Sequence, residues 1–295
     1  MGTSPEAGIT GWLCSILLIL SFNVQAADKP EPLLVIVIDD LGDNQAKGIA
    51  AINLPGALTY AFLPHTPFSS SLAKRAYKSG KEVILHAPME NKAGLRLGPG
   101  ALTQSLTTAE LAQVLNGGLD AIPNVVGMNN HMGSLLTEDR QKMQTVMRVA
   151  RNRGLFFLDS MTTPATVAWK VAAEQGVPVL MRDVFLDNKR EREYIHQQFV
   201  QALALAVTKG QAVAIGHPYP ETVAYLAEAL PQLAKLGIKL VTASELLELR
   251  PQRSLIQKKP SLKGCDRHEG HCPSYPLASS SKQNPGTITD QLNTD

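Results

Sequence analysis

The sequence is poor in aromatic residues, cysteine and net charge. Phe, Trp and Tyr make up 5% of the 295 residues, cysteine occurs 3 times, and the net charge is +2. No stretch combines Lys and Arg with aromatic side chains, which excludes nucleic-acid binding. The hydrophobic content of 44% and the charged content of 18% are those of a globular protein, and they exclude a disordered chain or a coiled coil.

The amino-terminal end carries an apolar run at residues 12–22, followed by the small residues Ala26 and Ala27. The run is shorter than the ~20 residues of a transmembrane helix. We therefore expect a secretory signal peptide over residues 1–27, and a periplasmic or secreted protein without a stable transmembrane span. The residues before the run include Glu6 and no Lys or Arg, which leaves an uncleaved amino-terminal anchor as the alternative.

The other end, residues 251–295, is rich in Ser, Pro, Lys, Gln, Asn and Thr and has no apolar periodicity, which predicts a disordered polar tail. Removal of the signal peptide would leave two cysteines, Cys265 and Cys272, both in this tail. They could form a small disulfide loop or bind a metal ion, although their spacing from the intervening histidines is too cramped for the usual zinc patterns.

Residues 28–250 alternate short apolar runs with longer helical patterns, as one domain. The runs predict strands at residues 33–38, 57–63, 82–85, 125–128, 155–158, 178–181, 212–215 and 238–241. Continuous apolar runs are typical of strands buried on both faces of a parallel sheet.

Helix signals separate these runs. The segments 107–110 and 242–245 match capping boxes. Five glycines are placed where helices should end: Gly80, Gly154, Gly176, Gly210 and Gly237. This alternation predicts a (β/α) barrel, complete or one unit short. A doubly wound open sheet has the same rhythm, but no GxGxxG follows the first strand, which weakens its dinucleotide-binding version.

Polar side chains gather at the predicted carboxyl ends of the strands, where α/β folds build their sites. Four of the five histidines outside the tail fall at such ends, and His196 alone lies in a helical stretch. The residues at these ends are Asp39, Asp40, His65, His86, Glu90, Asn129, Asn130, His131, Asp159, Ser160, Arg182, Asp183, Asp187 and His217.

The adjacent carboxylates of Asp39 and Asp40 repel each other unless they share a cation or one keeps its proton. A helix N-cap would explain one of them, whereas a metal site explains both, with one as ligand and the other as base. A carboxylate with two histidines, such as His86 and His131, is a common open zinc coordination. His217 is then a candidate general acid.

Taken together, five segments resemble the polysaccharide deacetylase superfamily, and most closely its divergent branch of exported bacterial proteins. They are residues 37–42, 85–90, 129–134, 157–160 and 214–218, within a similarity that spans 33–249. The resemblance implies a distorted (β/α)7 barrel that binds zinc or a similar divalent ion and deacetylates a polysaccharide. It also implies Asp39 as the base, Asp40 and His86 as metal ligands, and His217 as the acid.

The sequence departs from the family pattern at Glu90, which stands where the family has a second histidine. Either Glu90 binds the metal, or His131 supplies the missing ligand and Glu90 supports the site from outside. We favour His131. Asn130 and His131 occupy the place where the family has an arginine that orients the base. Asn130, Asp159 and Asp187 are candidates to bind substrate or to orient His217.

Two other functions remain open from the sequence. The departures at Glu90 and His131 also fit a catalytically inactive, metal-containing barrel that binds peptidoglycan or another glycan. A serine hydrolase built on Ser160 and His217 is disfavoured, because Ser160 lacks the G-x-S-x-G elbow. The sugar, the metal, and the oligomeric state are not determined by the sequence.

Overall fold

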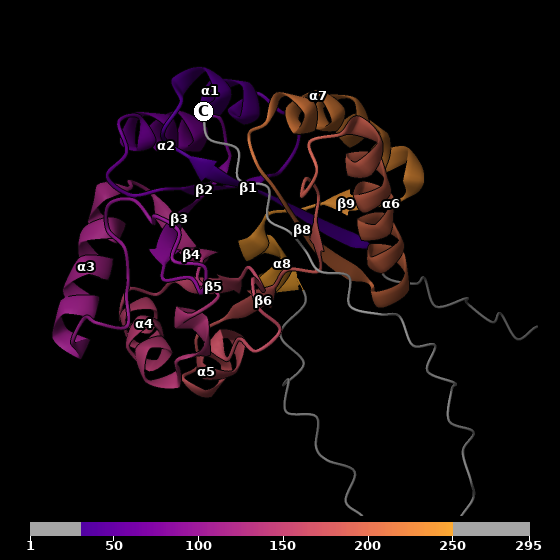
Figure 1. Cartoon of the computed structure of the whole chain (residues 1–295). Coiled ribbons are helices and arrows are strands. Elements are labelled where there is room, and N and C mark those ends of the chain that lie inside the picture. Colours follow the sequence, from indigo (N-terminus) through magenta and orange to yellow (C-terminus); the bar gives the residue numbers. More distant parts are fainter. Residues whose placement is uncertain (1–30, 250–295) are drawn as a thin grey trace, which may run out of the picture. The chain divides into compact units, whose positions relative to one another are not determined.

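The computed structural model describes residues 31–249, which form one curved parallel sheet surrounded by helices (Figure 1). The predicted signal peptide and the polar tail with Cys265 and Cys272 lie outside the described residues. The strands are β1 (Leu33–Leu41), β2 (Thr59–Phe62), β3 (Glu82–Met89), β4 (Val125–Met132), β5 (Phe156–Asp159), β6 (Val179–Met181), β7 (Val184–Phe185), β8 (Gln211–Gly216) and β9 (Lys239–Leu240).

The strands follow the order β6-β5-β4-β3-β2-β1-β8-β7, and β9 pairs with β1. Neighbouring strands pair in parallel throughout. All carboxyl ends of the strands therefore point to the same end of the sheet.

Helices pack on the outer face of the sheet, and α8 alone lies on its concave side (Figure 1). The helices are α1 (Gln45–Ile52), α2 (Ser69–Lys78), α3 (Thr108–Ala121), α4 (Arg140–Asn152), α5 (Ala168–Glu174), α6 (Arg192–Lys209), α7 (Pro220–Ala229) and α8 (Ala243–Leu249), with 3-10 turns η1 (Leu136–Glu138) and η2 (Leu230–Leu236). In this part of the chain, no helix has the length and apolarity to cross a membrane.

Two apolar cores explain the uninterrupted hydrophobic strands. In β1, Leu34 and Ile36 belong to the outer core beneath the helices. Val35 and Val37 belong to the inner core, together with Leu246 of α8. Because successive side chains of a strand point to opposite faces, both sets of positions must be apolar.

The amino-terminal end of the barrel is closed by α8. The buried carboxylate of Glu82, at the start of β3, accepts hydrogen bonds from Thr59 Oγ1 at 2.8 Å and from the backbone nitrogens of Ala243 at 3.0 Å and Ser244 at 3.2 Å. A carboxylate at a helix amino terminus satisfies N–H groups that lack partners within the helix. The opposite end, where the strands finish, is left open for a site.

The predicted α/β fold with a distorted (β/α) barrel is confirmed, because the parallel strands curl around an inner core. Each of the eight predicted runs contains a strand. The two-residue strand β7 was not predicted. The strands β1, β3 and β4 continue past their predicted ends to Leu41, Met89 and Met132. Both capping boxes form, and the five helix-ending glycines have positive φ.

Gly127, the third residue of β4, lies against the ring of Phe156 on β5. A Cβ at Gly127 would lie 2.4 Å from Phe156 Cζ, and Phe156 is itself held in the inner core. Gly117, within α3, would bring its Cβ within 4 Å of no heavy atom of the described chain beyond its own helical surroundings.

The two glycines predict opposite effects of alanine on the free energy of unfolding. Gly127→Ala should lower it by about 1–3 kcal/mol through overpacking. Gly117→Ala should raise it by about 0.5–1 kcal/mol, because alanine is the better helix former. Urea unfolding of both variants measures the difference, and a Gly127→Ala protein as stable as the wild type would contradict this packing.

Candidate metal centre

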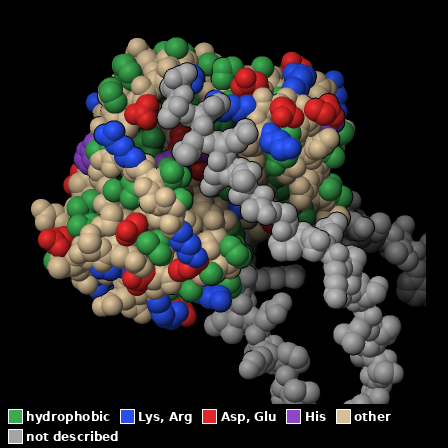
Figure 2. Space-filling view, in the orientation of Figure 1, with side chains coloured by type: hydrophobic (Ala, Val, Ile, Leu, Met, Phe, Trp, Pro, Cys, Tyr) green, Lys and Arg blue, Asp and Glu red, His purple; other side chains and the backbone are tan. Residues whose placement is uncertain are grey.

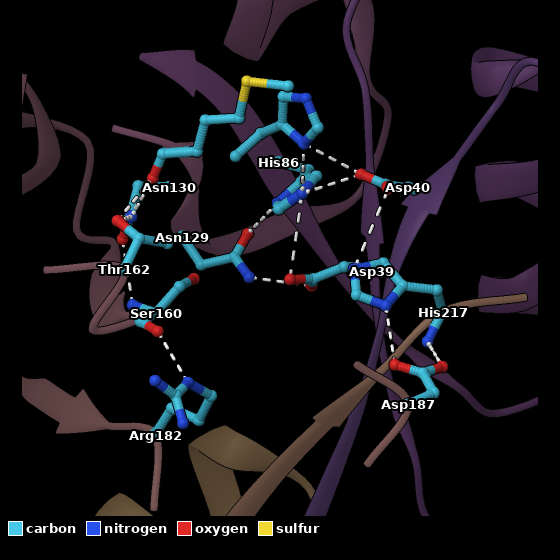
Figure 3. Close-up of polar contacts among 12 residues, drawn as sticks. Asp39, Asp40, His86, Asn129, Asn130, Ser160, Thr162, Arg182, Asp187 and His217 are labelled. Carbon is cyan, nitrogen blue, oxygen red and sulfur yellow. Dashed lines mark hydrogen bonds and ion pairs between the residues drawn. The ribbon is translucent and has the colours of Figure 1, made fainter. Parts of the chain in front are cut away.

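Asp39 and Asp40 lie within the last residues of β1. Adjacent side chains of a regular strand point to opposite faces, so both carboxylates cannot face one site without a distortion. The β1–β2 register shifts between Ile38 and Leu41, and Asp40 adopts a φ of 55°. This left-handed conformation is one that Asp tolerates better than most residues. The bulge lets both carboxylates point towards His86, as Figure 3 shows.

Three side chains converge on one point at this end. Asp40 Oδ1 lies 2.9 Å from His131 Nδ1 and 3.1 Å from His86 Nε2, and the two histidine nitrogens are 3.1 Å apart. Asp40 Oδ1 is buried between these two imidazole nitrogens. The three atoms form a group that can hold a metal ion. A carboxylate oxygen and two imidazole nitrogens are ligands that suit zinc and similar divalent ions.

The electrostatics of this group favour an ionised Asp40. Burial opposes ionisation, but His131 and His86 outweigh it and hold the pKa of Asp40 well below its usual range. Burial also disfavours a charged His86, but Asp39 and Asp40 outweigh that effect and raise its pKa. The carboxylate is therefore in the form that a metal ligand requires.

Asp39 is buried beside this group and is held by Asn129. Asn129 Nδ2 donates to Asp39 Oδ1 at 2.8 Å, and Asn129 Oδ1 lies 2.7 Å from His86 Nδ1 (Figure 3). Burial raises the pKa of Asp39, against the opposing effects of His86 and His217. We did not predict the role of Asn129. The signal in the sequence was its position two residues before His131, on the same face of the strand.

His217 follows β8 and faces the centre from the other side. Its Nδ1 lies 2.8 Å from Asp187 Oδ1, and its backbone N–H donates to Asp187 Oδ2 at 2.7 Å. Thr222 Oγ1 donates to the same carboxylate at 2.7 Å. His217 Nε2 is left facing Asp40 Oδ2 at 3.8 Å. Burial opposes the charged form, but Asp187 and Asp40 outweigh it and raise the pKa of His217 to about 9. These contacts therefore favour the imidazolium form of His217 at neutral pH.

Glu90 is directed towards the loop that follows β3. Its carboxylate accepts a hydrogen bond from the backbone nitrogen of Gln104 at 2.6 Å, and its own N–H donates to Leu102 O at 2.9 Å. Glu90 thus joins the two ends of the loop 91–103. It is not among the three residues that converge, Asp40, His86 and His131.

The remaining candidates, Asn130 and Asp159, form hydrogen bonds with the loops that follow β4 and β5. Asn130 Oδ1 accepts from Ser160 N at 2.9 Å, and Nδ2 donates to Met132 O at 2.7 Å. Asp159 accepts from Met161 N at 2.9 Å and from Thr166 Oγ1 at 2.8 Å. In this arrangement both residues brace the loops after β4 and β5.

Two hollows meet at Asp40. One of about 370 Å³ is lined by His131 and by Arg96 and Pro99 of the loop 91–103. The other, of about 140 Å³, is lined by Lys47 and Tyr219. In Figure 2, acidic and histidine side chains are visible deep in a recess of the molecular surface. The group is therefore reachable from solvent on two sides of Asp40.

The comparisons with known proteins agree with one another. The chain is 37% identical over 214 residues to the uncharacterised protein YibQ of Escherichia coli strain K12, covering 72% of this chain and 67% of that protein. It is 36% identical over 213 residues to an uncharacterised protein of Haemophilus influenzae, covering 72% and 76%.

A crystal structure of the uncharacterised protein ATU2773 from Agrobacterium tumefaciens C58 has a TM-score of 0.71 at 24% identity, over 75% of this chain and 91% of that one, which shows the same fold. Residues 36–247 match the family model described as divergent polysaccharide deacetylase. This match runs from within β1 to within α8 and includes every residue of the candidate centre. The chain therefore belongs to the divergent polysaccharide deacetylase family.

Proposed function

We propose that the protein is an exported, metal-dependent hydrolase that removes N-acetyl groups from an envelope polysaccharide or a related glycan. The observation that carries this proposal is the convergence of Asp40, His86 and His131 between a buried carboxylate, Asp39, and the imidazole of His217. Membership of the deacetylase family supports the substrate class, and the predicted signal peptide supports export.

The metal would be held by Asp40 Oδ1, His86 Nε2 and His131 Nδ1, and zinc suits this donor set best. When bound, a divalent cation there would supply Lewis-acid chemistry, polarising an amide carbonyl and making a nearby water more acidic. The residues fit the ion because a buried carboxylate oxygen, Asp40 Oδ1, lies 3.1 Å from His86 Nε2 and 2.9 Å from His131 Nδ1, so three donor atoms of suitable chemistry meet at one point.

Asp39 and His217 divide the proton transfers between them. Asp39 Oδ1 is occupied by Asn129, which leaves Oδ2 facing the centre at 3.7 Å from His86 Nε2. We assign to Asp39 the removal of a proton from the attacking water. His217 is held through its Nδ1 by Asp187, so its Nε2 is the atom that delivers a proton to the leaving amine.

Ser160 is not placed as a nucleophile. Its hydroxyl is buried and has no hydrogen-bond partner within the described part of the chain. A serine nucleophile needs a neighbouring base to take its proton, and no such contact is formed here within residues 31–249.

The ligand set predicts different effects of substitution at His131 and Glu90. His131→Ala should lose the metal, because one of three protein ligands is removed. Glu90→Gln should keep it, because Glu90 bonds to Gln104 of the loop. Metal content of the purified proteins by mass spectrometry tests this, and loss of metal from Glu90→Gln with retention in His131→Ala would reverse the assignment.

Asp39→Asn separates a hydrolase from an inactive glycan-binding barrel. The amide can still accept from Asn129 but cannot act as a base, so turnover of an N-acetylated glycan should fall by about 10²–10⁴-fold while the metal stays bound. Acetate release and metal content are measured together. If the protein is an inactive barrel, the wild type should release no acetate. The wild type and Asp39→Asn should then bind glycan equally well.

Asp187→Asn should also lower turnover, by about 10²–10⁴-fold, because an amide cannot hold His217 in the same tautomer and charge state. Asp183 is a matched control, since its carboxylate bonds to Lys209 and to Val213 N instead. Asp183→Asn should leave turnover within a few-fold of wild type. Equal losses in the two variants would argue against an oriented His217.

A further inference from the structure

The position of Asn129 follows from the pairing of β3 with β4. His86 and Asn129 are register partners across these two strands. Partners in register point to the same side of a sheet, and residues two apart on one strand share a face. Asn129 and His131 therefore both face the inside of the barrel, next to His86. From there the fully buried Asn129 reaches Asp39 on β1.

The two ends of this amide are chemically different. An asparagine Nδ2 only donates hydrogen bonds, and its Oδ1 only accepts them. Since Nδ2 donates to Asp39 Oδ1, the Oδ1 atom is the one that meets His86 Nδ1, at 2.7 Å. That contact is a hydrogen bond only if His86 carries a proton on Nδ1. In a neutral ring, the lone pair is then on Nε2, the atom that faces Asp40 Oδ1 and His131 Nδ1.

We infer that Asn129 is a positioning residue that holds His86 in the tautomer whose Nε2 can bind a metal, and at the same time fixes the Asp39 carboxylate beside it. The inference rests on the proposed function for the identity of ligand and base. A single amide thereby links a ligand from β3 to the base on β1.

The difference between the two ends allows them to be tested separately. Leucine in place of Asn129 has a similar volume and loses both hydrogen bonds. Aspartate keeps an acceptor for His86 Nδ1 but loses the donor to Asp39, and it places a second carboxylate beside the first. The ligand-holding and base-holding contributions should therefore separate between Asn129→Leu and Asn129→Asp.

The experiment is a titration of the full chain with Zn²⁺ against a chromophoric chelator, alongside kcat and KM for acetate release. Asn129→Leu should weaken Zn²⁺ affinity by about 10–100-fold, as loss of a ligand's hydrogen-bond partner commonly does. Asn129→Asp should keep the affinity within a few-fold while kcat falls at least 10-fold and KM changes little. The ¹⁵N shifts of the His86 ring should report Nδ1–H in the wild type and in Asn129→Asp.

Asn91→Leu is the matched control. Asn91 is also a buried asparagine whose amide is bonded at both ends, but its partners are backbone atoms of Leu95 and the sulfur of Met132, none of which is a proposed ligand or base. The Asn91→Leu variant should unfold at a lower temperature than the wild type and bind Zn²⁺ with the same affinity.

The inference is overturned if Asn129→Leu binds Zn²⁺ as the wild type does, or if Asn129→Asp loses affinity as much as Asn129→Leu. A wild-type protein that binds Zn²⁺ but releases no acetate would overturn the proposed function instead. The pattern of the two affinities would still decide the role of Asn129.

Discussion

The contact of the Asp40 carboxylate with the imidazoles of His86 and His131 governs how the open end of this barrel is built. Where Asp40 makes that contact, the pairing of β1 with β2 is irregular. Asp40 itself adopts a backbone conformation that is uncommon for residues other than glycine. Strained backbone of this kind persists where the surrounding structure compensates for it. Here, the two histidines supply the compensating attraction, since they hold the Asp40 carboxylate ionised despite its burial.

The proposed metal ligands come from three different strands of the barrel. Asp40 comes from β1, His86 from β3 and His131 from β4, so their spacing depends on the parallel pairing of strands rather than on a loop. Glu90 is not needed as a ligand in this arrangement, and its hydrogen bonds join both ends of the loop 91–103. At the other end of the barrel, Glu82 fixes α8 in place. The closed end provides rigidity, and the open end carries the polar chemistry.

The fold could be predicted because strands buried on both faces leave uninterrupted apolar runs, as in Leu33–Ile38. The sequence predicted that β3 and β4 end before their polar residues. His86 and Asn129 nevertheless lie within these strands, because their side chains are hydrogen-bonded to each other inside the barrel. β7 escaped prediction because two residues, Val184 and Phe185, carry no periodicity. The convergence of residues on the strand ends was predictable from position. Asp187 was one of three candidates to orient His217, and it is the one that contacts His217. The contact of Asn129 with Asp39 was not predicted, because it depends on strand register that one sequence does not encode locally.

The most direct test of the account is an anomalous-scattering experiment at the zinc edge on crystals of the metal-loaded chain. The account predicts one strong peak at about 2.0–2.2 Å from a carboxylate oxygen of Asp40, from His86 Nε2 and from His131 Nδ1. A peak bound by Glu90 in place of His131, or a fully loaded crystal with no peak beside Asp40, would contradict it.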